Sequence, residues 1–341
     1  MSSVPQSFGR RQIAGIPAAV FVRHLLLFVF TFCTATIAGA LFPFGPIYAF
    51  PDFQPTSASE IVLAILNLPN SYALLVFKIV RTILMEPEHL RSGITFSGSL
   101  LFILLSHELG HYIACRKYGV RATLPFFIPS PPLIGPAGTF GAFIKILSPF
   151  PSRRAVFDIG VAGPIAGFVA LIPIAIIGII QMRVISPAEA ASSAVEVGGI
   201  TFVDPLFMQI LASIVGKNLS FSVGNPFYFA AWIGLLVTAL NLIPSGQLDG
   251  GHAIYALFGE GVHRWSGRIA FIFMAFASAA GWFVYGSPSG LLFTVVLAIM
   301  MRLRHPSPRD LAPLGGWRRA VALITAIIFV LSFAPVPIRF N

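Results

Sequence analysis

Charged side chains are scarce in this sequence. Only 10% of its 341 residues are Asp, Glu, Lys or Arg, and only 12 are acidic, whereas 56% belong to the hydrophobic set. A soluble globular domain carries about a quarter charged residues, so this chain has too few to cover a water-facing surface. The main solvent of the chain is therefore the lipid bilayer, in agreement with its mean hydropathy of +0.86.

Cysteine is also scarce, and this excludes a disulfide framework. Cys33 and Cys115 are the only two cysteines, and both lie inside apolar stretches. The net charge of +10 would suit a nucleic-acid partner. However, the basic residues are scattered between apolar runs and do not form one basic stripe. Membrane topology explains the charge better, and no nucleic-acid partner is expected.

Long apolar runs predict the membrane spans. A helix that crosses roughly 30 Å of hydrocarbon needs about 20 residues. The sequence predicts an all-α polytopic membrane protein with about seven spans (a range of about six to eight). The runs lie at residues 21–42, 94–115, 156–180, 227–242, 269–285, 290–302 and 320–333. The sixth run is short, so an interfacial position stays open. The stretch 61–84 is interrupted by polar residues and Pro69, so it could span, dip into the membrane or lie flat.

Basic residues between the spans indicate the orientation of the chain. If the stretch 61–84 does not span and the N-terminus is cytoplasmic, most basic residues fall on the cytoplasmic side. These include Arg116, Lys117, Arg153 and Arg154. If the stretch does span, the N-terminus changes side, and everything after residue 94 can keep the same orientation.

Ionisable residues inside an apolar span point to a functional site. The sequence Ser106-His107-Glu108-Leu109-Gly110-His111 lies near the end of the span 94–115. The two histidines are four residues apart and share a helix face, so both imidazoles can bind one metal ion, and Glu108 can reach a water on that ion. The competing explanation is a chance match, or histidines satisfied by hydrogen bonds. It is disfavoured because burying these groups without a metal is costly in a medium without water.

A catalytic zinc site usually has three protein ligands and one open position. The segment 241–252, at the cytoplasmic end of the span 227–242, offers Asp249. Asp204 lies in the external connection, on the wrong side of the membrane. Asp158 begins a span on the correct side and stays open as a ligand, although the helix dipole also explains an acid at that place. His252 is a further possible ligand, with a structural role favoured.

The two motifs together resemble the site-2 protease family of intramembrane zinc metalloproteases. H-E-L-G-H and N-x-x-P-x-x-x-x-D-G occur in the expected order, about 130 residues apart, each on its own apolar segment. The resemblance implies that His107, His111 and Asp249 bind one Zn²⁺ ion per chain and that Glu108 activates the water. It also implies that Asn241 holds the substrate or polarises the scissile carbonyl.

The segment between the two motifs resembles the family's membrane-associated β-hairpin and edge strand. It lies between the H-E-x-x-H helix and the next span. Residues 138–142 could offer an unpaired strand edge to an extended substrate, with Gly138, Thr139, Phe140 and Gly141 as the expected substrate-binding residues; a turn or interfacial packing is the alternative. The pattern is closest to the branch found in cyanobacteria, plant chloroplasts and other bacteria. That branch lacks an inserted PDZ domain, and none is expected here.

The resemblance implies three parts in the chain. Residues 1–92 form an N-terminal tail, the first span and an apolar interfacial or re-entrant segment, residues 93–259 form the catalytic core, and residues 260–341 form the C-terminal transmembrane helices. The expected location is the bacterial cytoplasmic membrane, with the zinc site nearer the cytoplasmic face.

The expected activity is hydrolysis of a peptide bond within or near the transmembrane segment of single-span membrane proteins. A catalytically silent relative or a metal-binding membrane transporter is the alternative. A transporter would carry ionisable residues along several spans, whereas here they concentrate at two helix ends. A silent relative would usually have lost Glu108 or a ligand, and none of these residues is missing.

Overall fold

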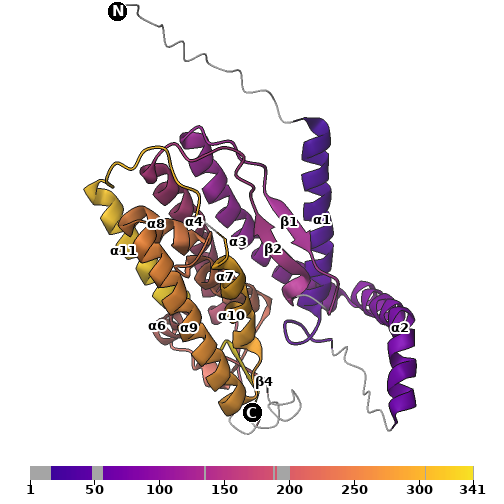
Figure 1. The fold of residues 1–341 in the computed structure, drawn as a ribbon. Coiled ribbons are helices and arrows are strands. Elements are labelled where there is room, and N and C mark those ends of the chain that lie inside the picture. The colour runs from indigo at the N-terminus through magenta and orange to yellow at the C-terminus, as the bar shows by residue number, and fades with distance from the viewer. Residues whose placement is uncertain are drawn as a thin grey trace, which may run out of the picture.

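The apolar runs of the sequence form a bundle of helices (Figure 1). The computed structural model describes residues 17–47, 57–133, 136–186, 189, 200–303 and 305–340. The helices are α1 (Ala18–Ala40), α2 (Ala58–Met85), α3 (Pro87–Lys117), α4 (Arg153–Ile180), α6 (Leu206–Val215), α7 (Pro226–Leu242), α8 (Asp249–Phe258), α9 (Glu260–Tyr285), α10 (Ser289–Met300) and α11 (Gly316–Ser332).

Each predicted span coincides with one of these helices, which confirms a mostly helical protein. Five helical segments are long and apolar enough to cross a membrane: 18–40, 66–85, 87–117, 153–180 and 260–285. Helices α7 and α10 are apolar but shorter, and α11 has 17 residues. The number of about seven crossings therefore stays a prediction, while a polytopic helical membrane protein is supported.

Helices α3, α4 and α7 form the centre of the bundle, and their contact faces bury Leu100, Leu171 and Leu235 completely. Small residues allow the close approach of α3 and α4. A β-carbon at Gly110 would lie 2.4 Å from the backbone oxygen of Ala162, so only glycine fits there. This contact places the second half of α3, which carries the H-E-x-x-H motif, directly against α4.

A β-hairpin follows α3, as predicted. Strands β1 (Phe126–Pro129) and β2 (Thr139–Phe143) are antiparallel, and Phe127 pairs with Ala142. The short helix η1 (Pro136–Gly138) leads into β2. In Figure 1 the hairpin lies beside α1, and the rings of Phe28 and Phe127 meet edge to face with their centroids 5.0 Å apart. The first helix thus supports the hairpin along its length.

Two further small sheets are formed by short strands outside the helices and were not predicted. Strand β3 (Arg183–Val184) pairs with β5 (Ser222–Val223), and β4 (Ile200–Phe202) pairs with β6 (Ile338–Phe340). A short helix, η2 (Leu219–Phe221), precedes β5. Strands of two or three residues leave no alternation that a sequence pattern can reveal. The second sheet ties the C-terminal strand to the connection between α4 and α7.

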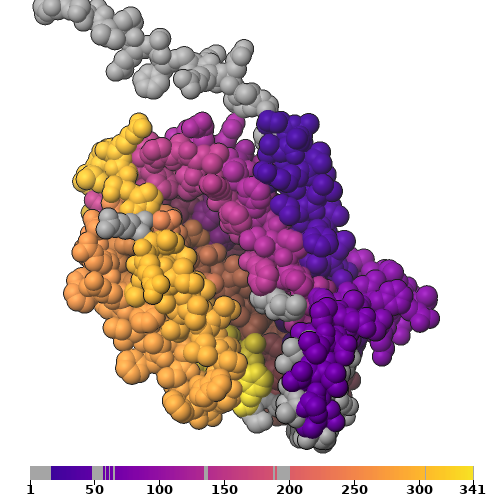
Figure 2. All heavy atoms as spheres, turned by 45° about the vertical axis from the view of Figure 1, so that its right-hand side comes forward, coloured from indigo at the N-terminus to yellow at the C-terminus, as the bar shows by residue number. Residues whose placement is uncertain are grey.

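The ambiguous stretch 61–84 forms most of α2, which extends away from the bundle (Figures 1 and 2). The chain leaves α1 and enters α3 at the same place. The Ser92 hydroxyl donates to the backbone oxygen of Gly39 at 3.2 Å, and a β-carbon at Gly93 would lie 2.3 Å from the oxygen of Thr36. The segment that contains α2 therefore returns to the end of the bundle from which it started.

Candidate metal centre

Three potential metal ligands converge at one point between α3 and α8. His107 Nε2 and His111 Nε2 are 3.1 Å apart, and each lies 3.3 Å from the same oxygen of Asp249. This is the one group of three or more His, Cys, Asp or Glu side chains suited to a metal that was found among the described residues. The structure thus brings together the three ligands that the resemblance implied.

The spacing of these donor atoms fits zinc. Zinc bonds to imidazole nitrogen and carboxylate oxygen are about 2.0–2.2 Å long, so neighbouring ligand atoms of a tetrahedral ion lie about 3.3 Å apart. The observed separations of 3.1 and 3.3 Å match this geometry. Three protein ligands leave one tetrahedral position for water, as in a catalytic zinc site.

The His111 ring is oriented by α4. Its Nδ1 donates a hydrogen bond to the backbone oxygen of Ile159 at 2.7 Å. With the proton on Nδ1, Nε2 carries the lone pair that a metal requires. The ring lies over Gly163, where a β-carbon would be 2.1 Å from Nε2. The Gly163 position therefore has to be glycine for the imidazole to occupy this place.

Asp249 is positioned by a tight connection between α7 and α8. Helix α7 ends at Leu242, and Pro244 follows within two residues, where a proline cannot continue the backbone ladder. The chain turns and restarts as α8 at Asp249. A β-carbon at Gly250 would lie 2.0 Å from the Leu242 oxygen. The glycine of the D-G pair thus lets the start of α8 pack on the end of α7, which carries Asn241.

Glu108 and Asn241 lie next to the three ligands. Glu108 is 6% exposed, and Asn241 Nδ2 lies 3.4 Å from His107 Nε2. Together with the three ligands they line a cavity of about 510 Å³. The hairpin side of this cavity is formed by residues 142–146, and the opposite side includes Gln247, His252 and Pro306. Figure 2 shows the surface hollowed between the magenta hairpin and the gold helix α10.

The strand continuing from β2 presents one backbone edge to this cavity. Lys145 and Leu147 form backbone hydrogen bonds with the segment 121–123. Because backbone groups alternate in direction along a strand, those of Ile144 and Ile146 point the other way. The N–H of Ile144 accordingly faces the Glu108 carboxylate. An extended peptide in the cavity would meet this edge next to Glu108.

The predicted substrate-binding residues Gly138 to Gly141 immediately precede the cavity-lining segment 142–146 in the sequence. None of them lines the cavity. The backbone oxygen of Gly138 accepts a hydrogen bond from Thr34 of α1 at 2.7 Å, and the Thr139 hydroxyl donates to the oxygen of Ile128 at 2.9 Å. Phe140 is exposed. Their predicted contact with substrate stays a prediction. Ala142, the last residue of the predicted strand edge, does line the cavity, whereas the adjoining segment 143–146, which borders the metal ligands, was not predicted.

The other acidic and histidine candidates stand outside the donor group. Asp158 accepts hydrogen bonds from Arg318 at 2.7 and 2.8 Å. His252 lines the cavity, but its Nδ1 lies 2.6 Å from Nε2 of His305. Asp158 therefore serves a contact between helices, and His252 joins α8 to the loop that follows α10.

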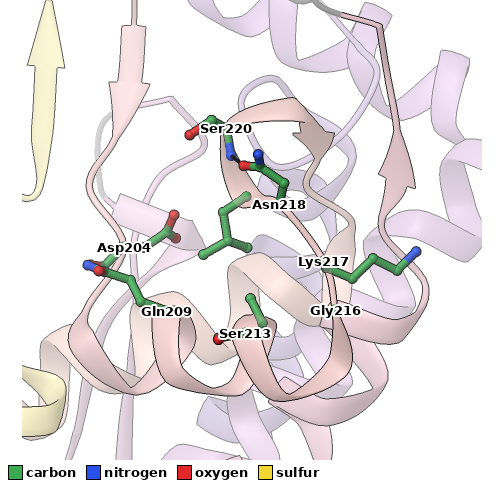
Figure 3. Close-up of a pocket in the computed structure, with 9 residues that line it drawn as sticks. Asp204, Gln209, Ser213, Gly216, Lys217, Asn218 and Ser220 are labelled. Carbon is green, nitrogen blue, oxygen red and sulfur yellow. Dashed lines mark hydrogen bonds between the residues drawn. The ribbon is translucent and has the colours of Figure 1, made fainter.

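Asp204 lies at the opposite end of α7 from Asn241, beside a second hollow of about 510 Å³ (Figure 3). The residues around this hollow come from α6 and η2, from the loop between them and from the loop that precedes α6. Burial raises the pKa of the Asp204 carboxyl, and the hydrogen bond from the Tyr228 hydroxyl partly offsets this. Seventeen residues of α7 separate the two ends by about 25 Å. Asp204 is thus far from the histidines, as expected.

Comparison with known proteins agrees with this geometry. Residues 95–280 match the profile of Peptidase family M50. The chain belongs to this family. The matched interval includes all three ligands, Glu108 and Asn241, and the resemblance to site-2 proteases is thereby confirmed.

Plant proteins named as zinc metalloproteases are among the similar sequences. The chain is 31% identical over 72% of its length to "Probable zinc metalloprotease EGY1, chloroplastic" of Arabidopsis thaliana, and the match covers 43% of that protein. The Oryza sativa subsp. japonica EGY1 is also 31% identical, over 41% of its length. The rice EGY3 is 25% identical over 83% of this chain and 51% of its own. The chain spans about half the length of these relatives, or less. Their names give no support to the expected bacterial cytoplasmic membrane.

Proposed function

We propose that this chain is an intramembrane zinc metalloprotease that hydrolyses a peptide bond within or near the transmembrane segment of membrane proteins. The observation that carries the proposal is the convergence of His107, His111 and Asp249 beside Glu108, in a cavity between apolar helices and the segment that continues the hairpin. A metal ligand set without a nearby base would suit storage or structure. A base next to an open coordination position suits hydrolysis.

The mechanism assigns the proton transfers to Glu108. Zinc, when bound, polarises the scissile carbonyl and lowers the pKa of a water molecule in its open position. Glu108 accepts the proton of that water and later returns it to the leaving amine. Its burial excludes bulk water, which would compete for these protons. The backbone N–H of Ile144, which faces the carboxylate, is proposed to orient it for both transfers.

Asn241 is proposed to hold the carbonyl oxygen of the substrate. Its amide Nδ2 lies 3.4 Å from a ligand atom and therefore borders the place where the carbonyl oxygen would sit. A neutral N–H donor stabilises a developing oxyanion most in a dry site. The amide is fixed on the last turn of α7, so it needs little reorganisation during the reaction.

The substrate is proposed to bind in an extended form along the edge at Ile144 and Ile146. A transmembrane helix pairs its backbone groups internally, so its scissile carbonyl is inaccessible until the helix unwinds. Pairing with the strand edge replaces the hydrogen bonds lost in unwinding. Single-span membrane proteins are therefore the proposed substrates, with the predicted residues Gly138 to Gly141 extending the same strand toward α1.

The arrangement of α1, α2 and α3 supports a topology for the site. Because α1 ends where α3 begins, the segment between them crosses the membrane an even number of times or not at all. With a cytoplasmic N-terminus, α3 then runs toward the cytoplasm. The two histidine ligands lie in its last three turns, followed by Arg116 and Lys117. We propose that the zinc site is nearer the cytoplasmic face.

The test uses the purified full chain in detergent with a model single-span substrate. The unmodified chain is expected to cleave it, and Glu108→Gln to retain zinc and lose cleavage. The matched control is Glu88→Gln, at the exposed start of the same helix, which should cleave normally. Cleavage by Glu108→Gln would contradict the mechanism. Absence of cleavage by the unmodified chain with zinc bound would favour a catalytically silent relative.

A further inference from the structure

A buried ion pair joins the C-terminal helix to the region of the metal centre. Arg318 of α11 donates from Nε to one oxygen of Asp158 at 2.7 Å and from Nη2 to the other at 2.8 Å. The Tyr118 hydroxyl donates to the same carboxylate and accepts a hydrogen bond from Arg318 Nη2 at 3.1 Å. The side chains of Arg318 and Asp158 are each 11% exposed.

These three residues join the ends of three helices. Tyr118 caps α3, two turns after the ligand His111. Asp158 lies in α4 and is followed by Ile159, whose backbone oxygen accepts the hydrogen bond from His111 Nδ1 at 2.7 Å. Arg318 lies in the first turn of α11. The contact thus fixes the end of α3 to the turn of α4 that orients the ligand.

We propose that Tyr118, Asp158 and Arg318 act as positioning residues for His111, and that α11 is part of the support of the metal centre. A shift between the end of α3 and the start of α4 would lengthen the hydrogen bond from Nδ1 to Ile159. It would turn Nε2 away from Asp249 and His107. Groups that hydrogen-bond directly to a metal ligand typically change metal affinity by about 10- to 100-fold. The three residues act one step further out, through Ile159, so the lower end of this range is expected.

The chemistry of the contact suits positioning better than stabilisation. A buried ion pair often contributes no more to stability than apolar side chains of the same volume. A bidentate guanidinium–carboxylate pair, however, sets the direction as well as the distance between its partners. Arg318 also lies beyond residues 95–280, the interval that matches the family. The proposal therefore gives a function to a part of the chain that the family match does not cover.

The test measures metal binding, so its outcome is separate from that of the proposed protease activity. The positioning proposal rests on the proposed function only in one respect, namely that His107, His111 and Asp249 form a zinc site. The affinity of the purified full chain in detergent for Zn²⁺ is measured by competition with a chelator. Arg318→Gln is expected to weaken binding about tenfold. Its matched control, Arg319→Gln, alters the exposed neighbour on the same helix and should leave the affinity unchanged.

A second readout separates positioning from a general loss of stability. Co²⁺ in place of Zn²⁺ gives an absorption spectrum that depends on ligand geometry, and Arg318→Gln should change it while Arg319→Gln does not. A merely structural role would lower the melting temperature and leave the affinity and the spectrum unchanged, and this result would overturn the proposal.

A milder variant covers the case in which Arg318→Gln does not fold. Tyr118→Phe keeps the ion pair and removes one hydroxyl, so a loss of affinity of about fivefold is expected, as for one hydrogen bond. Unchanged zinc affinity and an unchanged Co²⁺ spectrum in Tyr118→Phe would then overturn the proposal. If the unmodified chain itself binds no zinc, both this proposal and the proposed function are wrong. Failure of cleavage alone affects only the latter.

Discussion

Gly163 lies directly against the His111 ring, and a β-carbon at this position would fall 2.1 Å from His111 Nε2. This distance is far below van der Waals contact. The two residues belong to neighbouring helices, α4 and α3. A side chain at residue 163 would therefore have to move the His111 ring or push the two helices apart. The identity of residue 163 therefore controls whether His111 can face Asp249.

The first prediction follows from this contact. Gly163→Ala should displace the His111 ring and weaken Zn²⁺ binding by at least about tenfold, comparable to the loss of an orienting partner. The measurement is the zinc content of purified protein after dialysis against a chelator. Gly98→Ala is the matched control, because a β-carbon at Gly98 in α3 meets nothing within 4 Å. Equal zinc retention by both variants would show that the His111 ring can bind zinc from another position.

The second prediction concerns the choice among the acidic residues. Asp249→Ala should reduce the zinc content from one ion per chain to nearly none, because only two protein ligands remain. The affinity loss should exceed the roughly 100-fold that loss of an outer partner produces. Asp204→Asn should keep its zinc, since Asp204 lies at the other end of α7. Elemental analysis of the two purified variants decides the matter, and zinc loss in Asp204→Asn alone would reverse the assignment.

The third prediction concerns the strand edge beside Glu108. Proline has no backbone N–H, so Ile144→Pro removes the group that faces the Glu108 carboxylate. Cleavage of a model substrate should fall more than about tenfold, since removing one preorganised donor costs that much or more, while the zinc content stays at one per chain. Ile144→Val keeps the N–H and should cleave at nearly the normal rate. Normal cleavage by the proline variant would exclude a role for this edge.

The fourth prediction concerns topology. Because α1 ends beside the start of α3, single cysteines placed at Glu88 and at Lys217 should react with an impermeant thiol reagent from the same side of the membrane. Cysteines at Lys117 and Arg264 should react only from the opposite side. The background is the chain with Cys33 and Cys115 replaced by serine. Labelling of positions 88 and 117 from one side would show that α3 does not cross the membrane.

Part of the metal centre could be predicted because two of its ligands are close together in the sequence. His107 and His111 are one helical turn apart, so the sequence alone places their rings on one face. Membrane topology excluded Asp204. Asp249 could be chosen over Asp158 only through the family resemblance, because nothing in its own spacing relates it to α3. In the structure one Asp249 oxygen lies 3.3 Å from Nε2 of each histidine of α3, and the close packing of Gly250 on Leu242 holds the start of α8 on α7.

The parts that could not be predicted depend on contacts between distant segments. The edge at Ile144 and Ile146 faces the cavity because Lys145 and Leu147 pair with residues 121–123, and an apolar sequence does not reveal that register. Arg318 and Asp158 are 160 positions apart. Each alone is explained by membrane topology or by a helix end, so their pairing is visible only in the folded chain.

The most direct test of the central claim is X-ray absorption spectroscopy at the zinc edge on the purified full chain. The account predicts one zinc per chain bound by two imidazole nitrogens and a carboxylate oxygen, with one imidazole contribution lost in His111→Ala. A sulfur ligand, or a zinc environment that stays the same after both His107 and Asp249 are replaced by alanine, would contradict it.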